Sequence, residues 1–175
     1  MGKVYFTPSV EILPDKNSKL ISQNISGFKI ESSGSEAGLK LINHNYKKHL
    51  TKFSRMRISF YIRYEQKWDI DKSYISILGD TDKKLASMNF RLLFGDKNLT
   101  KIIKYLENPA DSELWLRVAI KISLSQIRVF QLLLGLLNPK EAAYEEISHE
   151  KLTIKFHMFR DTAPIHFEIR DMEIA

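Results

Sequence analysis

The sequence contains no cysteine, and this absence removes several kinds of chemistry at once. Disulfide bonds, thiol nucleophiles and cysteine-ligated metals are all excluded. The longest strongly apolar segment, Leu132–Leu137, is far shorter than the roughly 18 apolar residues of a membrane-spanning helix. The opening segment MGKVYFTPSV has no cleavable apolar region. We therefore expect either an intracellular protein or an excised domain of a larger protein.

Patterns that mark catalytic and metal sites are also scarce. The sequence has no glycine-rich phosphate loop and no Ser–His–Asp motif. Its nearest match to a row of catalytic carboxylates runs from Glu168 to Glu173, but the alternation of a regular strand sends Glu168 and Asp171 to opposite faces. The pairs Asp69–Asp71 and Asp80–Asp82 offer two carboxylates each, whereas calcium takes about six to eight oxygen ligands. We expect a non-catalytic protein without a metal or other cofactor.

Acidic residues are the scarcer charged class. The chain has 27 Lys and Arg residues against 21 Asp and Glu residues, which gives a net charge of +6. A basic excess favours acidic partners, such as an anionic glycan or an acidic protein surface. Nucleic acid is disfavoured as a partner, because no known nucleic-acid-binding motif is visible.

What the sequence does contain is a repeated alternation of apolar and polar residues. In MRISFYIRY (Met56–Tyr64) one face is apolar, whereas the other carries arginine, serine and tyrosine. Similar patterns cover residues 88–94, 113–124, 152–158 and 165–174, with shorter ones at 4–6, 28–30, 39–42 and 73–78. A period of two residues is typical of half-buried strands, and turn-forming segments such as ENPADSE separate them. We predict an all-β antiparallel sandwich with one or two short helices, forming one domain over residues 1–175.

The segment from Glu113 to Gly135 begins as a strand and then loses its alternation. We predict a strand to Leu124, a turn over Ser123–Gln126 and a returning strand over Ile127–Gln131. A helix is favoured over a strand for residues 99–107, whose apolar residues recur at helical spacing, although both remain open.

The apolar segment Leu132–Leu137 needs a cover. One candidate is a helix beginning at the capping sequence Asn138-Pro139-Lys140-Glu141. The alternative is a partner chain, in a homo-oligomer or from another domain of a parent protein, because exposed apolar patches often mark interfaces. In that case the interface residues are Leu132, Leu134 and Leu136.

The polar faces of four predicted strands, around residues 56–64, 88–93, 114–121 and 153–159, are rich in basic side chains. If these strands share one sheet, its solvent face carries Arg57, Tyr61, Arg63, Arg91, Arg117, Lys121, Lys155 and His157. Arginine and lysine interleaved with tyrosine can hold an anionic ligand by bidentate pairing and stacking. The alternative is that these residues only keep the outer face of the sheet solvated.

Four segments, in order, resemble the concanavalin A-like lectin and laminin G-like jelly-roll superfamily. They are GFKIESSGSEAGLKLIN, RMRISFYIRYEQKWDIDKSYISILGD, LWLRVAIKISLSQIRVF and IHFEIRDMEIA. The receptor-binding jelly roll of clostridial neurotoxins is similar in the same order. The pattern departs from the family at VFQLLLG, where laminin G-like domains carry a Tyr-x-Asn-Gly or Tyr-x-Asp-Gly turn, and it has no counterpart of the legume-lectin metal loop.

The resemblance implies a jelly-roll sandwich with a lectin-like function. We expect a non-catalytic recognition module that binds glycans, anionic ones included, on a basic sheet face. Trp68 and Trp115 are potential platforms for sugar rings, although Trp115 also suits packing in the outer layer or the core. The alternative is a protein–protein assembly module that uses the same sandwich without binding sugar.

Overall fold

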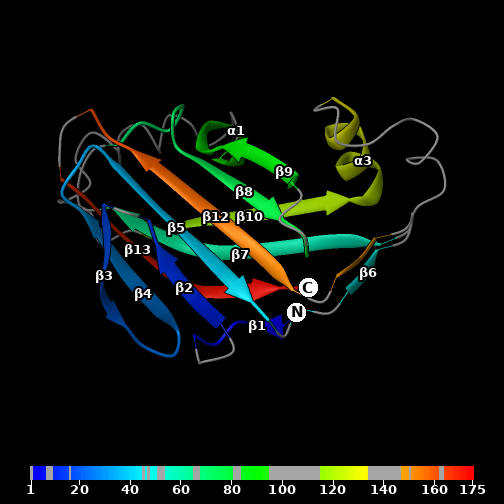
Figure 1. Ribbon diagram of the computed structural model, residues 1–175, viewed down its shortest axis with the longest axis horizontal. Coiled ribbons are helices and arrows are strands. Elements are labelled where there is room, and N and C mark those ends of the chain that lie inside the picture. The colour runs from blue at the N-terminus through cyan, green and yellow to red at the C-terminus, as the bar shows by residue number, and fades with distance from the viewer. Residues whose placement is uncertain are drawn as a thin grey trace.

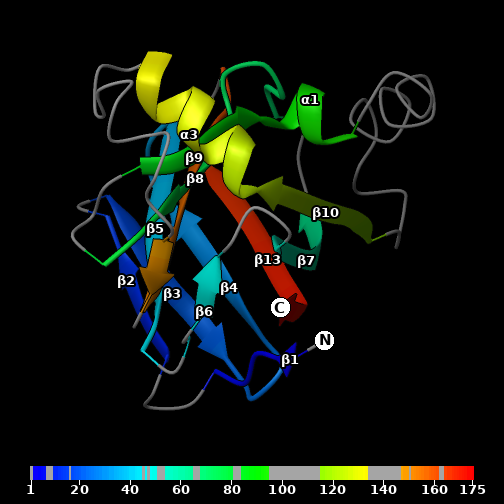
Figure 2. The ribbon, with the colours of Figure 1, turned by 90° about the vertical axis from the view of Figure 1, so that its right-hand side faces the viewer.

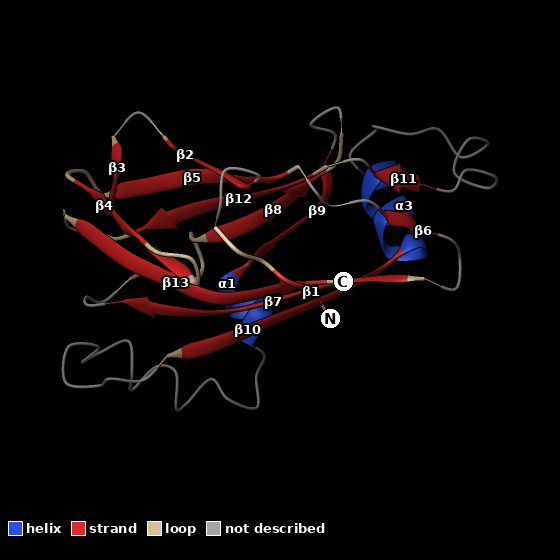
Figure 3. Cartoon of the chain, turned by 90° about the horizontal axis from the view of Figure 1, so that it is seen from below, coloured by secondary structure: helices blue, strands red, loops and turns tan. Residues whose placement is uncertain are grey.

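The computed structural model describes residues 2–6, 10–15, 17–44, 46, 48–50, 54–64, 68–80, 84–94, 115–133, 147–149, 151–161 and 164–175. Within these ranges two antiparallel sheets lie face to face, with two short helices at their margins (Figures 1 and 3). The all-β sandwich predicted from the alternation is confirmed. No helix among the described residues is long and apolar enough to cross a membrane.

Sheet A has the strand order β10-β7-β13-β4-β3, with β1 paired to the far end of β13. Its strands are β1 (Gly2–Lys3), β3 (Ser18–Gln23), β4 (Gly27–Ser32), β7 (Arg55–Tyr64), β10 (Leu116–Ser123) and β13 (Ile165–Ile174). The last strand therefore lies in the middle of the sheet, between strands from the beginning and the centre of the chain.

Sheet B has the order β2-β5-β12-β8-β9. Its strands are β2 (Val10–Pro14), β5 (Glu36–Asn43), β8 (Tyr74–Leu78), β9 (Lys84–Asn89) and β12 (Leu152–Phe159). A separate two-stranded sheet joins β6 (Lys48–Leu50) to β11 (Ile147–His149). The chain crosses repeatedly between the layers, so neighbouring strands within a sheet are mostly distant in sequence.

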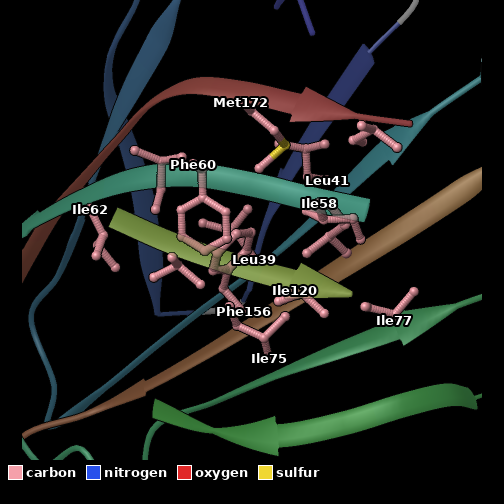
Figure 4. Close-up of a cluster of buried hydrophobic side chains, with 14 of the residues drawn as sticks. Leu39, Leu41, Ile58, Phe60, Ile62, Ile75, Ile77, Ile120, Phe156 and Met172 are labelled. Atoms are coloured by element: carbon pink, nitrogen blue, oxygen red, sulfur yellow. The ribbon is translucent and has the colours of Figure 1, made fainter. Parts of the chain in front are cut away.

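The apolar faces of the two sheets enclose a common core (Figure 4). Phe60 from sheet A and Phe156 from sheet B are fully buried and meet edge to face, with ring centres 5.4 Å apart. Such aromatic pairs add about 0.5–1.5 kcal/mol beyond the burial of their area. In β7 and β10, for example, the period of two divides the strand between a core face and an outer face.

The predicted returning strand after Ser123 is wrong, because Leu124–Leu133 forms the helix α3, which packs against β9 (Figure 2). Ser123 and Gln126 form a capping box. The backbone N–H of Ser123 donates to Gln126 Oε1 at 2.8 Å, and the backbone N–H of Gln126 donates to Ser123 Oγ at 3.3 Å. At the start of a helix the first backbone N–H groups have no partner within the helix, and these bonds satisfy two of them. A β-turn does not need such side-chain caps.

The predicted strand over residues 88–94 is wrong beyond Asn89. It ends at Asn89, whose Oδ1 accepts a hydrogen bond from the backbone N–H of Leu92 at 3.0 Å and starts the helix α1 (Phe90–Phe94). Helical spacing lets both Phe90 and Phe94 pack edge-on against Trp68, with ring centres 4.8 and 6.0 Å away. The expected helices near residues 99–107 and 138–141 lie outside the described residues.

Candidate functional site

The predicted basic residues do not share one sheet. Arg57, Tyr61 and Arg63 lie on β7 and Arg117 and Lys121 on β10, all facing outward from sheet A. The other two strands that were expected to share this sheet do not belong to it. β12 lies in sheet B, and the segment around residue 90 forms the end of β9, also in sheet B, and the start of α1.

The remaining members of the predicted set are Arg91, Lys155 and His157. Lys155 and His157 lie on β12 and face outward from sheet B. Arg91 lies on α1 and pairs with Asp71 through both of its carboxylate oxygens. The single basic face expected from the sequence is therefore wrong, and only its β7 and β10 members are brought together.

On sheet A the outward cations of β7 and β10 form what we call the basic strip: Arg55, Arg57, Arg63, Arg117 and Lys121. Arg57 stands directly opposite Lys121, and Tyr61 directly opposite Arg117. Among the described residues none of these cations forms a salt bridge, and Arg63 Nε is buried without a hydrogen-bond partner. Like charges directly opposite one another destabilise a sheet, so an anion bound here would relieve repulsion.

Next to the basic strip, Arg170 of β13 lies among aromatic rings. Its guanidinium carbon is 4.0 Å from the ring centre of Trp115 and 5.8 Å from that of Tyr61. We call these three residues the aromatic–arginine stack. Cation–π contacts of this kind contribute about 0.5–1 kcal/mol at exposed sites. Trp115 thus lies on the outer face of sheet A and not in the core.

Beside the stack the surface is hollowed, with a volume of about 290 Å³. The hollow lies over β3, β4 and β13 and is lined by Ser22, Asn24, Lys29, Glu168 and Arg170, among others. Lys29 Nζ is 3.7 Å from Glu168 Oε1. The volume of the hollow is at the lower end of the range for small-molecule sites, roughly 300–1,000 Å³.

Backbone geometry at Gly27 keeps β4 close to β13 beneath this hollow. A Cβ at this position would lie 2.6 Å from the carbonyl oxygen of Ile169 and 3.1 Å from Arg170 Cβ. The turn before it is fixed by Asn24, whose Oδ1 accepts hydrogen bonds from the backbone N–H groups of Ser26 and Gly27, both at 2.9 Å. Glycine is therefore required here by close approach.

The outer face of sheet B carries a different arrangement. Lys155 stands opposite Lys40, and the ring of His157 stacks on Tyr74 with ring centres 4.8 Å apart. Glu36 Oε1 is 4.0 Å from His157 Nε2. This group lies across the sandwich from the basic strip and cannot touch the same small ligand.

Trp68 is not a surface platform. It is 4% exposed and forms part of the core with Phe90 and Phe94. Of the two tryptophans considered from the sequence, only Trp115 remains available for a ligand.

The predicted apolar interface is described only at Leu132, which is half-buried on α3; Leu134 and Leu136 lie outside the described residues. Nearby, a hollow of about 350 Å³ lies between β9, β10 and the two helices, lined by apolar side chains together with Ser87, Lys121 and Gln126. Leu92 lines this hollow and is 72% exposed, and Leu133 at the end of α3 is 81% exposed.

The chemistry available on sheet A is binding by charge, stacking and hydrogen bonds. Among the described residues no group of three or more histidine or acidic side chains is placed to hold a metal. In the part of the chain that the structure describes, Glu168 is the one carboxylate lining the hollow of sheet A, and it pairs with Lys29, whereas glycoside hydrolysis uses two carboxylates. Asp171, considered with it in the sequence, lies at a bulge with φ of 52°.

Sequence reasoning did not include Lys29, Asn24 and Arg170 in the site. Arg170 is recognisable as an outward residue of its strand, but only the order of the strands shows that it stands opposite Tyr61. A usable signal in the sequence is the outward position of Glu168 and Arg170 on one predicted strand.

Comparisons with known proteins give distant likenesses. No protein-family model and no curated protein matches the chain. A β-1,2-glucanase from Parabacteroides distasonis is 12% identical, with a TM-score of 0.48, over 99% of this chain and 24% of its own. A structure described as CBM4 is 9% identical, with a TM-score of 0.47, over 100% and 92% of the two chains.

The K1 cleaved adhesin domain of Lys-gingipain from Porphyromonas gingivalis W83 is 9% identical, with a TM-score of 0.41, over 98% and 92% of the two chains. In a bacteriophage CBA120 tailspike and a Pseudoalteromonas glucanase, the chain spans only 20% and 16% of the matched protein. At such identities and TM-scores the likeness carries no information on ligand or activity.

Proposed function

We propose that this protein is a non-catalytic recognition module that binds glycans, anionic ones included, across the outer face of sheet A. The observation that carries the proposal is the aromatic–arginine stack lying directly beside the basic strip. The fold family that we propose for the chain is the concanavalin A-like jelly roll. The pairing of the first strand, β1, with the last, β13, supports this assignment.

An acidic sugar presents charged acidic groups and an apolar ring face. The basic strip suits the acidic groups, and the aromatic–arginine stack suits the ring face. Arginine forms paired, charge-assisted hydrogen bonds with carboxylate or sulfate groups, and each bond to a charged group contributes about 1.5–3 kcal/mol. Aromatic rings supply a flat apolar surface together with a polar tip. Arg117, Tyr61 and Arg170 stand in one row across three neighbouring strands, so one extended ligand can contact all three.

The test is calorimetric titration with heparin, sialylated and neutral oligosaccharides, at low and at raised salt. We expect Arg117→Ala to weaken binding of an acidic oligosaccharide about tenfold or more, through loss of a charge-assisted bond. Lys155→Ala is the matched control, since it removes one positive charge from the opposite sheet. Absence of glycan binding at low salt, or equal loss in both variants, would overturn the proposal.

The second candidate is a protein–protein assembly module. The observation in its favour is the hollow beside α3, with Leu92 exposed in its lining and Val129 and Leu133 exposed on α3 itself. Exposed apolar groups gathered around a hollow are typical of protein interfaces. This function requires self-association or a partner at α3 and leaves the outer face of sheet A without a role.

A further inference from the structure

The hollow on sheet A differs from the basic strip in its balance of charge. Each of its cations faces a carboxylate: Lys29 Nζ lies 3.7 Å from Glu168 Oε1, and Arg170 Nε lies 3.5 Å from Asp171 Oδ2. Among the described residues no cation of the basic strip forms an ion pair, although Arg63 stands opposite Glu168 in the strand register. The same sheet face therefore joins a nearly neutral, polar hollow to a strongly positive surface.

The polar groups of the hollow suit hydroxyl groups, which both donate and accept hydrogen bonds. The Glu168 carboxylate can accept from one hydroxyl, and the Lys29 ammonium can donate to its neighbour. The guanidinium carbon of Arg170 lies 4.0 Å from the ring centre of Trp115, and Nε lies beside Asp171. A guanidinium has five N–H donors, so Arg170 has further donors for a ligand. Asn24 has its Oδ1 occupied by backbone N–H groups, so its amide nitrogen is a further donor.

The strand register sets the separation of the two regions. Glu168 stands opposite Lys29 on one side and Arg63 on the other, and Arg170 stands opposite Gly27 and Tyr61. Adjacent strands are about 4.8 Å apart, so the hollow on β4 and the outermost cations on β10 are separated by roughly 14 Å. A short oligosaccharide lying across the strands would contact both regions.

We propose that the hollow is a subsite for an uncharged sugar unit, and that the ligand is a mixed glycan in which uncharged and acid-bearing units adjoin. The inference rests on the proposed glycan binding and specifies the class of glycan. The uncharged unit exchanges hydroxyl hydrogen bonds with Glu168 and Lys29. The acid-bearing unit pairs with Arg63 or Arg117.

The experiment compares two anionic probes by calorimetry. A hyaluronan hexasaccharide alternates uncharged and acid-bearing units, whereas a hexagalacturonate carries an acid on every unit. Glu168→Gln should weaken binding of the hyaluronan probe about tenfold, because the hydrogen bond is then made to a neutral acceptor in place of a charged one. It should leave hexagalacturonate binding unchanged or stronger, since removing a carboxylate makes the face more positive. Glu173→Gln is the matched control, as it makes the same charge change on the same strand outside the hollow.

The outcomes separate the inference from the proposed function. If Glu168→Gln weakens both probes equally, or weakens neither, the subsite for an uncharged unit is wrong, although glycan binding stands. If the wild-type protein binds neither probe nor any other glycan, the proposed function fails and the inference fails with it. Thermal unfolding of each variant shows whether the fold is retained. We expect only a small change in stability, because a partly exposed ion pair such as Lys29–Glu168 contributes about 1 kcal/mol or less.

Discussion

Replacing Gly27 by alanine should destabilise the protein and disturb the hollow. The added Cβ would lie 2.6 Å from the carbonyl oxygen of Ile169 and within 3.1–3.3 Å of Arg170 Cβ and Cα. All of these atoms belong to β13, which pairs with β4 at this point through Arg170 and Gly27. A backbone oxygen cannot rotate away, so β4 must move away from β13.

Two other glycines provide a graded comparison. At Gly34 a Cβ would meet only ordinary contacts, at 3.8 Å from Ser32 Oγ and 3.9 Å from the Glu36 nitrogen. At Gly38 it would overlap the Asp15 carboxylate, which belongs to a side chain that can turn away.

The change in the free energy of unfolding of each variant follows from two opposing effects. Overpacking costs about 1–3 kcal/mol, whereas glycine-to-alanine substitution lowers the entropy of the unfolded chain and stabilises by about 0.4–1 kcal/mol where the backbone allows it. Gly34→Ala should therefore stabilise slightly. Because the unfolded-state effect cancels between the variants, Gly27→Ala should be less stable than Gly34→Ala by about 1–3 kcal/mol, with Gly38→Ala between them.

Urea unfolding monitored by tryptophan fluorescence and by circular dichroism measures these differences, since a change of midpoint at constant slope reports stability. Calorimetry on the same samples should show that Gly27→Ala binds acidic oligosaccharides more weakly than Gly34→Ala. Equal stability of these two variants would refute the close packing of β4 on β13, and with it the shape of the hollow.

Two further predictions concern the helices. The hydrogen bond from Arg91 holds the pKa of Asp71 below its usual range, and carboxyl titration by NMR should show this pKa returning to the ordinary range in Arg91→Ala. The pKa of Asp71 is lower in the folded state than in the unfolded state. The stabilisation from this ion pair is therefore present above the ordinary carboxyl pKa and is lost as the pH falls through the lowered value. A titration midpoint of Asp71 at the ordinary value in the wild type would contradict the pairing with Arg91. If the protein is an assembly module, Leu133→Asp should convert a self-associating wild type into a monomer in light scattering without changing its unfolding, since Leu133 is 81% exposed; two monomeric samples would remove that function.

The strands that could be predicted from the sequence are those with one fully buried face. β7 and β12 alternate cleanly because their apolar residues fill the core between the sheets. β2 and β3 were missed, since they lie at sheet edges and most of their residues are exposed or half-buried, as at Leu13 and Ile21. With little burial there is little pressure for alternation, and the strand signal is weak.

The helices show the opposite problem. In both, apolar residues fit a strand and a helix about equally well over a few positions. Capping groups decide between them: Ser123 with Gln126 at the start of α3, and Asn89 at the start of α1. These signals are present in the sequence, and a search for capping boxes within predicted strands would have found the first of them.

The candidate site could be predicted only in part, for a reason of topology. Alternation correctly places Arg57, Arg63 and Arg117 on outer faces, but it does not say which strands are neighbours. β12 resembles β7 and β10 in its alternation and its basic residues, yet it lies in the opposite sheet. Hydrogen bonding between strands distant in sequence determines membership of a sheet, and a single sequence carries no periodic trace of it.

The same topology makes the proposed site depend on the closed sandwich. The hollow combines groups from β3, β4 and β13, and the basic strip adds β7 and β10, so every strand of sheet A except β1 contributes. Glu168 and Lys29 are neighbours only because the last strand is inserted between β4 and β7. In the unfolded chain these groups are far apart, so the unfolded state has no comparable site. A glycan bound to sheet A must therefore raise the free energy of unfolding by RT ln(1 + [L]/Kd), where [L] is the concentration of free glycan. This linkage gives a measure of binding that does not depend on the titration itself.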